Sequence, residues 1–127
     1  NDNLVRRNEI WETYNEAFSE LPVMLPAPDA PDTVHARHLY TLMIDKQRCG
    51  IGRDEFMHRL HQLNIGTGVH YIGIHLHPYY RERFGFSPND FPNATWVSDR
   101  TASLPLSPKL TDDDVADVIE AVKSTLS

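Results

Sequence analysis

The chain has 127 residues, of which 40% are apolar and 24% charged, a composition that excludes a disordered chain and indicates one compact domain spanning residues 1–127. Its 12 basic and 18 acidic side chains give a net charge of −6, which argues against binding to nucleic acid. It has no apolar stretch long enough to cross a membrane, and its lone cysteine, Cys49, excludes an internal disulfide framework and favours a reducing, cytoplasmic compartment.

The first segment has the apolar repeat of a helix, which we expect Pro22 to end. Its apolar residues fall on one side of that helix: Leu4, Trp11, Tyr14, Phe18 and Leu21. A proline-rich loop follows over residues 22–34, with a short edge strand expected at 23–25. Residues 37–44 are apolar on both faces of a strand, which predicts a central position in a sheet.

A second helical repeat covers residues 53–63. Asn64 is suited to the left-handed conformation that ends such a helix, and Ile65 is placed to close the cap. We expect a strand at residues 65–71, where glycines leave room for another backbone or a ligand to approach closely.

Residues 72–90 form a long excursion between the regular elements. A helical turn is expected at 78–84, because a proline at its start favours the first turn of a helix. A short helix over 92–101 and a short strand over 103–106 follow along the chain.

The final helix is the most regular element that the sequence predicts. Thr111 and Asp114 have the spacing of a capping box, and an apolar stripe follows: Val115, Val118, Ile119, Val122 and Leu126. The order of elements predicts an α+β fold, an α/β sandwich in which helices pack on a small antiparallel or mixed sheet of three or four strands.

The chain is rich in histidine, with seven such residues, and six of them stand in pairs: His35 and His38, His58 and His61, His75 and His77. His75 and His77 followed by Glu82 resemble the first metal motif of the cupins, but the residues after His77 predict a helix rather than a barrel strand. The pattern therefore favours a polar loop over a metal site.

Nucleophilic and phosphate-binding signatures are missing from the sequence. There is no serine elbow and no glycine-rich phosphate loop. Cys49 lies beside Arg48, which can lower the pKa of a thiol, but a structural role is the favoured interpretation. The patterns by themselves therefore indicate a ligand cleft near residues 70–80, where His and Tyr are frequent.

Two segments carry a resemblance to a known family: Ile65-Gly66-Thr67-Gly68-Val69-His70-Tyr71 and His75-Leu76-His77-Pro78-Tyr79-Tyr80. They are similar to the C-terminal part of the DegT/DnrJ/StrS sugar aminotransferases. Further blocks agree in the same order: Arg6-Arg7-Asn8, His38-Leu39-Tyr40, Arg53-Asp54-Glu55-Phe56, Pro92-Asn93-Ala94, Ser98-Asp99-Arg100 and Ser103-Leu104-Pro105-Leu106-Ser107-Pro108. The resemblance covers essentially the whole chain, and the turn Arg48-Cys49-Gly50-Ile51 leans toward the branch that makes 4-amino sugars.

The resemblance implies the small domain of a homodimeric enzyme with the aspartate-aminotransferase fold. Such enzymes use pyridoxal phosphate (PLP) to transfer an amino group from glutamate to a nucleotide-linked keto sugar, as in surface polysaccharide biosynthesis. The family's Schiff-base lysine and its cofactor-binding groups belong to a large N-terminal domain, which this chain lacks. Lys46, Lys109 and Lys123 do not have the sequence context of that lysine, so we expect the isolated chain to be inactive and to bind no PLP.

The family's motifs also suggest which residues contact substrate. His70 and Tyr71 match residues that face the sugar nucleotide, and His75 and Tyr79 match the motif that follows. No catalytic, cofactor-binding or metal-binding residue is expected within the chain. For His70, a purely structural hydrogen-bonded histidine is the alternative interpretation.

A function from a different class stays open at this point: a free-standing, His-rich module that binds a ligand or a metal. The aromatic residues of the first helix, Trp11, Tyr14 and Phe18, also lead to an expectation about surface. If the chain is a domain separated from its partner, we expect them to pack partly on the absent domain and to leave an apolar patch exposed.

Overall fold

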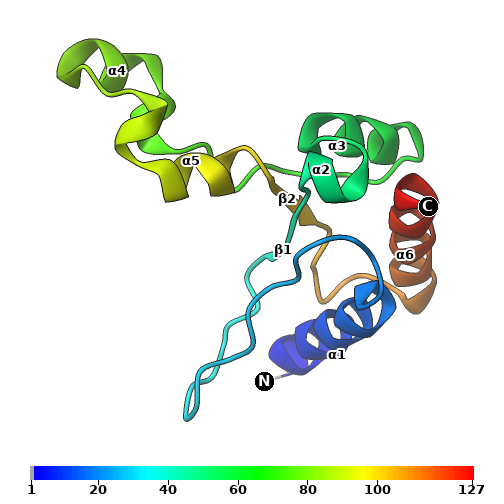
Figure 1. Ribbon diagram of the computed structural model, residues 1–127. Coiled ribbons are helices and arrows are strands. Elements are labelled where there is room, and N and C mark those ends of the chain that lie inside the picture. The colour runs from blue at the N-terminus through cyan, green and yellow to red at the C-terminus, as the bar shows by residue number, and fades with distance from the viewer. Residues whose placement is uncertain (1) are drawn as a thin grey trace.

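The computed structural model of the protein describes residues 2–127 (Figure 1). Its elements, in chain order, are α1 (Asp2–Phe18), β1 (Tyr40–Met43), α2 (Lys46–Cys49), α3 (Arg53–Gln62), η1 (Ile74–Leu76), α4 (Pro78–Phe84), η2 (Pro88–Asp90), α5 (Pro92–Ser98), β2 (Thr101–Leu104) and α6 (Asp112–Leu126). Helices α1, α3 and α6 gather beside the two strands with α2 next to α3, and α4 and α5 project from this body on the other side. The predicted α+β class is confirmed.

The sheet is smaller than the sequence predicts. Within residues 2–127 it consists of β1 and β2, paired antiparallel from Tyr40 opposite Leu104 to Met43 opposite Thr101. The expected strand at 65–71 is reduced to a single bridge between Gly68 and Ser103, and the expected edge strand at 23–25 to one bridge at Met24. The prediction of three or four strands was therefore wrong, because glycines and prolines keep these segments from extending their backbone pairing.

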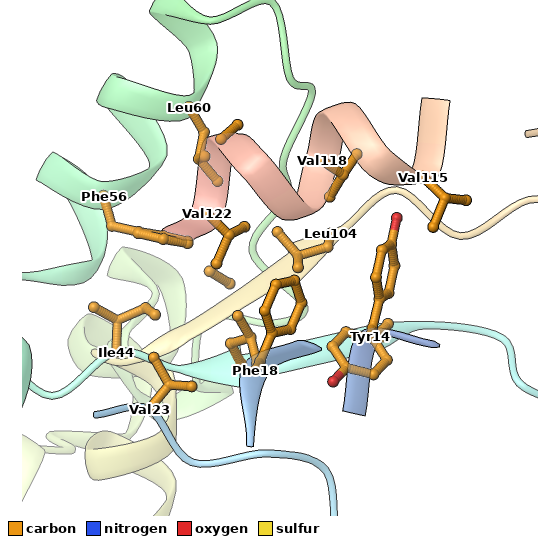
Figure 2. Close-up of a cluster of buried hydrophobic side chains, with 14 of the residues drawn as sticks. Tyr14, Phe18, Val23, Ile44, Phe56, Leu60, Leu104, Val115, Val118 and Val122 are labelled. Carbon is orange, nitrogen blue, oxygen red and sulfur yellow. The ribbon is translucent and has the colours of Figure 1, made fainter. Parts of the chain in front are cut away.

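One hydrophobic core lies on the helix-covered side of the strands (Figure 2). Its fully buried members include Tyr14 and Phe18 of α1, Tyr40 and Leu42 of β1, Phe56 and Leu60 of α3, Ala102 of β2 and Val122 of α6. Burial raises the pKa of the Tyr14 and Tyr40 phenols. Tyr14 donates to the carbonyl of Pro105 over 3.0 Å and Tyr40 to Asn15 Oδ1 over 2.9 Å, so both hydroxyls are satisfied inside the core.

The burial of the α1 aromatic residues overturns one expectation. Trp11 is 6% exposed, and Tyr14 and Phe18 are fully buried by the chain's own strands and helices. Trp11 packs edge-on against Tyr40, with 4.9 Å between ring centroids. These residues therefore need no absent domain to cover them.

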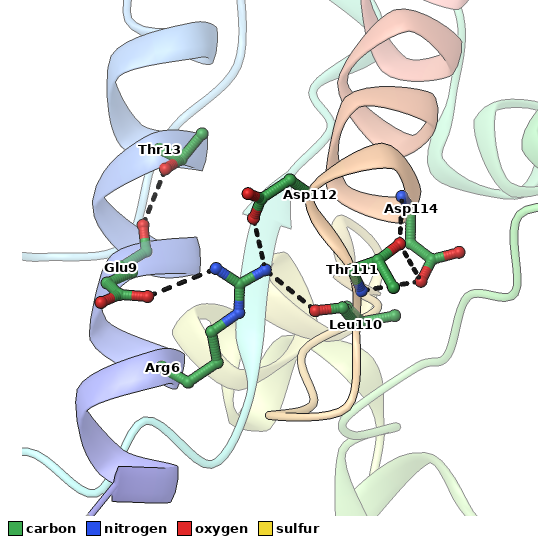
Figure 3. Close-up of polar contacts among 7 residues, drawn as sticks. All are labelled: Arg6, Glu9, Thr13, Leu110, Thr111, Asp112 and Asp114. Atoms are coloured by element: carbon green, nitrogen blue, oxygen red, sulfur yellow. Dashed lines mark hydrogen bonds and ion pairs between the residues drawn. The ribbon is translucent and has the colours of Figure 1, made fainter.

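Local signals placed several helix ends correctly. The Thr111–Asp114 capping box is present in both directions, and Arg6 donates to the Leu110 carbonyl and to Asp112, which ties α1 to the start of α6 (Figure 3). At the end of α3, Asn64 has a φ of 61° and the Ile65 amide donates to the Leu60 carbonyl over 2.9 Å. This is the predicted left-handed cap.

Other boundaries differ from the prediction. Helix α1 ends at Phe18, before Pro22, and the helix expected over 92–101 ends at Ser98, because β2 begins at Thr101 rather than at residue 103. Residues 46–49, for which no helix was predicted, form the short helix α2, with Asp45 accepting from the Gln47 amide at its N-cap. Arg37 lies outside the strand, with a φ of 49°.

Candidate functional site

Residues 73–98, which we call the arm, contain η1, α4, η2 and α5 and project from the body (Figure 1). Prolines start three of these four elements: Pro78, Pro88 and Pro92. Gly85 ends α4 with a φ of 71°, which a residue with a side chain rarely adopts. The arm is therefore shaped by short-range start and stop signals rather than by burial of its own core.

His70 lies where the body meets the arm and is bonded to the sheet. Its Nδ1 is 2.8 Å from the Ser103 hydroxyl of β2, and Ser103 is buried. The ring lies over Gly68, where a Cβ atom would come within 2.7 Å of the His70 Cε1. We expected the glycines here to admit a backbone or a ligand: the Gly68 backbone pairs with that of Ser103, and the space at its Cβ position is taken by the ring of His70.

Tyr71 is the exposed member of this pair, at 69%. Its ring stands edge-on to that of His70, with 4.8 Å between centroids, and the peptide bond that joins the two residues is cis. The Tyr71 hydroxyl makes no hydrogen bond with residues 2–127, so it is free to donate to a ligand.

His75 is buried inside the arm, with 5% of its surface exposed. Its Nε2 is 2.7 Å from the Thr95 hydroxyl, and its ring lies 5.1 Å from that of Phe91. The Thr95 hydroxyl in turn donates to the Pro88 carbonyl over 2.8 Å. The imidazole therefore faces η2 and α5 of the arm rather than solvent.

Tyr79 stands on α4 and is 65% exposed. A continuous series of ring contacts joins it to His75, with centroid distances between 5.1 and 6.1 Å, through Tyr80, Phe84, Phe86 and Phe91. The four predicted site residues thus form two groups: His70 with Tyr71 at the base, and His75 with Tyr79 along the arm. Sequence reasoning missed the aromatic residues between them, although the density of aromatic residues over 79–91 was visible in the sequence.

Three hollows on the surface are lined by other residues than these four. The largest, about 930 Å³, lies between the 25–39 loop, the outer side of β1 and α5. A second, of about 480 Å³, is lined on α6 by the acidic residues Asp114, Asp117 and Glu120. The third, of about 390 Å³, is a depression on the arm next to Arg81 and Glu82. The first hollow has a mainly apolar lining and the second is lined by carboxylates, so neither has the features of a phosphate site.

The residues present do not supply a cofactor lysine at any of these hollows. Lys46, Lys109 and Lys123 are all exposed, and none of them lines one of the three. Within residues 2–127, no group of three or more His, Cys, Asp or Glu side chains is arranged to hold a metal ion.

The remaining sequence motifs are accounted for locally. His77 is the N-cap residue of α4 and Glu82 lies within that helix, so the cupin-like spacing falls on a helix rather than on barrel strands. Burial raises the pKa of the Cys49 thiol, whose Sγ is 3.1 Å from the Pro22 carbonyl. A thiol in that setting is a poor nucleophile. No helix in the described range meets the length and hydropathy that crossing a bilayer requires.

Comparison with known proteins places this geometry in context. The model of the DegT/DnrJ/EryC1/StrS aminotransferase family matches residues 1–123. The protein MJ1066 of Methanocaldococcus jannaschii is 49% identical over 122 residues, and the spore coat polysaccharide biosynthesis protein SpsC of Bacillus subtilis is 47% identical over 119 residues. These alignments cover 96% and 93% of this chain, respectively.

A solved structure has the same fold. Spr1654 of Streptococcus pneumoniae, a protein named as a sugar aminotransferase, has a PMP-form that matches 97% of this chain with a TM-score of 0.84 and 27% identity. Its PLP-form matches 98% of the chain with a TM-score of 0.82. The chain spans about a third of the length of its relatives: 32% of MJ1066, 31% of SpsC and 31% of the PMP-form of Spr1654.

Proposed function

Because the chain belongs to the DegT/DnrJ/EryC1/StrS aminotransferase family, we propose that it is the C-terminal small domain of an enzyme that transfers an amino group from glutamate to a nucleotide-linked keto sugar. The family match over residues 1–123 carries this proposal. The polysaccharide biosynthesis named for SpsC supports a sugar substrate. The turn Arg48-Cys49-Gly50-Ile51 is the ground for proposing a 4-amino sugar as the product class.

The cofactor of the whole enzyme is PLP under this proposal, in keeping with the PLP-form and PMP-form of Spr1654. When bound, PLP supplies the electron sink for moving the amino group. The lysine that holds it lies outside these 127 residues, because Lys46, Lys109 and Lys123 are exposed and line none of the three hollows. The whole enzyme is a cytoplasmic homodimer, and the isolated chain is inactive.

Within this chain, the proposed role is to recognise the sugar nucleotide. Tyr71 and Tyr79 expose their phenols, and His70 has one ring nitrogen bonded to Ser103 and a second for another partner. Phenol and imidazole groups donate hydrogen bonds to phosphate and sugar oxygens. The base of the arm and its α4 helix are therefore the proposed substrate-facing part of the domain.

The test uses the full-length enzyme in two half-reactions. The PLP-form is mixed with glutamate, and the resulting PMP-form with a nucleotide-linked 4-keto sugar; the change in cofactor absorbance gives each rate. We expect both halves to proceed, and we expect the same keto sugar without its nucleotide to react much more slowly. A full-length enzyme that transfers the amino group only to small keto acids would contradict the proposed substrate class.

A further inference from the structure

We infer that His75 is a positioning residue rather than a residue that itself contacts substrate. It holds η1, at the start of the arm, against η2 and α5, at its end, and so places the exposed Tyr79 of α4 between them in the chain. The inference rests on the proposed function, because the position of the arm affects catalysis only if the arm faces substrate. Its first support is location: a ring that is 5% exposed and bonded within the arm has little surface left for a ligand.

The hydrogen bonds determine which nitrogen of His75 carries the proton. The Thr95 hydroxyl has one hydrogen, and the Pro88 carbonyl, 2.8 Å away, can only accept it. The Thr95 oxygen must then accept from His75, so Nε2 at 2.7 Å is the protonated nitrogen. The imidazole of His75 in η1 is thus connected through the Thr95 hydroxyl of α5 to the Pro88 carbonyl of η2, so it joins the first element of the arm to the last two.

Gly73 makes room for this arrangement. A Cβ atom on Gly73 would lie 2.7 Å from the His75 Cε1 and 3.0 Å from its Nδ1. The φ of Gly73 is −55°, which any residue can adopt, so glycine is required here by space and not by backbone conformation. The Gly73 amide also donates to the Ser98 hydroxyl over 2.9 Å, which fixes the same point to the end of α5.

The series of aromatic rings connects His75 to Tyr79 on α4. Phe91 contacts the His75 ring, and each following ring contacts the next as far as Tyr79, which is 65% exposed on α4. Since the arm has few buried side chains, the orientation of α4 depends on this line of rings and on the hydrogen bonds at its buried end. Loss of the His75 contacts should loosen the arm without disturbing the body.

The sharpest variant is Gly73→Ala in the full-length enzyme, with Gly66→Ala as the matched control. The first adds a methyl group where the His75 ring lies, whereas nothing lies within 4 Å of the Cβ position at Gly66. We expect Gly73→Ala to speed amide hydrogen exchange across residues 74–95 and to leave the exchange of α1, α3 and α6 unchanged. Gly66→Ala should leave both regions unchanged.

Variants of His75 separate the hydrogen bond from the ring. His75→Phe keeps a ring but cannot donate to Thr95, whereas His75→Gln can donate from a similar position. We expect His75→Phe to raise the KM for the sugar nucleotide about three- to tenfold, with the glutamate half-reaction unchanged, as loss of one net hydrogen bond predicts. His75→Gln should restore most of this loss, and Thr95→Val should reproduce it without adding to His75→Phe in the double variant.

The outcomes separate this inference from the proposed function. Hydrogen exchange needs no substrate, so unchanged exchange in the arm of His75→Phe and Gly73→Ala overturns the inference whatever the enzyme's activity. A looser arm with an unchanged KM also overturns it, because the arm then does not position substrate contacts. A wild-type enzyme without sugar aminotransfer refutes the proposed function, and with it the role in substrate positioning, while the exchange data still decide whether His75 holds the arm.

Discussion

Arg37 and Asp29 form a two-bond ion pair, with Nη1 2.8 Å from Oδ1 and Nη2 2.6 Å from Oδ2 of the carboxylate. The Nε of Arg37 also donates to Asn8 Oδ1 over 2.8 Å, and its guanidinium lies 4.5 Å from the centre of the Trp11 ring. Arg37 therefore anchors the 25–39 loop to α1. The loop lines the hollow of about 930 Å³, so this ion pair shapes the surface between the loop and α5.

The planar fork of Arg37 predicts that Arg37→Lys is not a conservative change. Lysine cannot make the paired bonds to Asp29 and the bond to Asn8 at the same time, nor stack as well on Trp11. We expect the free energy of unfolding to fall by about 1–2 kcal/mol, measured by urea denaturation. The control is Arg59→Lys, whose ion pair with Glu55 is nearly half exposed and should be worth under about 1 kcal/mol. Equal effects at both sites would contradict the anchoring role.

His70→Ala in the full-length enzyme tests the base of the arm. If His70 donates to a phosphate or sugar oxygen, the KM for the sugar nucleotide should rise about ten- to a hundredfold, because a hydrogen bond to a charged group contributes roughly 1.5–3 kcal/mol. The glutamate half-reaction should change much less, since glutamate has no nucleotide. Ser103→Ala is the companion variant: it keeps the imidazole but removes its orienting partner, so a smaller rise is expected. A lower melting temperature with an unchanged KM in His70→Ala would make the histidine purely structural.

Acid should weaken the link between Asp45 and Arg100. The Arg100 guanidinium, 2.8 Å away, and the Gln47 amide lower the pKa of the Asp45 carboxyl from its ordinary value of 3.8. A carboxyl whose pKa is lower in the folded than in the unfolded state stabilises the fold. The contribution is fully present above the unfolded-state pKa and is lost as the pH falls through the folded-state pKa. Asp45→Asn keeps an acceptor for Gln47 but removes the charge.

We therefore expect Asp45→Asn to melt at a lower temperature than the wild type at neutral pH, with the difference shrinking as the pH falls below about 4. Thermal unfolding followed by circular dichroism between about pH 7 and about pH 3 measures this difference. Glu12→Gln is the control, because Glu12 is exposed on α1 and has no ion pair in the described part of the chain. A pH-independent difference for Asp45→Asn would show that the charge is unimportant.

The isolated chain should bind a hydrophobic dye and self-associate. Exposed apolar residues gather on and beside the arm: Tyr71, Ile72, Ile74, Tyr79, Phe84 and Phe91. A concentration of exposed apolar side chains in one part of a monomer favours association. We expect the double variant Ile74→Ser/Phe84→Ser to reduce dye fluorescence and to shift sedimentation toward the monomer. Val5→Ser, at an exposed position on α1, should change neither; a strictly monomeric wild-type chain that binds no dye would contradict the prediction.

The isolated chain should also lack a specific site for PLP. Its three lysines, Lys46, Lys109 and Lys123, are all exposed. After incubation with PLP and reduction, we expect peptide mapping to find weak modification spread over them, whereas the full-length enzyme should show one stoichiometric adduct on a lysine outside this chain. A single stoichiometric adduct within the chain would refute the assignment of the cofactor to the rest of the enzyme.

Three helix ends were predictable because their signals lie within a few residues of one another. The α6 capping box needs Thr111 and Asp114, the α3 cap needs Asn64 and the residue after it, and α4 begins at the proline that the sequence marks. Each interaction closes over three to five residues, so composition and spacing were sufficient to predict it. The family resemblance was also present in the sequence, as ordered blocks over the whole chain.

Pairing and exposure needed the tertiary structure. The partner of His70 is Ser103 and that of His75 is Thr95, which lie 33 and 20 residues away along the chain, and no local pattern specifies either contact. The sheet has two strands rather than three or four, and the aromatic residues of α1 are buried in the core. Both outcomes have the same reason, because strand pairing and burial depend on which distant segments of the chain meet. The sequence by itself determined the longer helices and the family resemblance, whereas only the tertiary structure decided that His75 is buried and Tyr71 exposed, because side-chain environment depends on contacts between residues far apart in the chain.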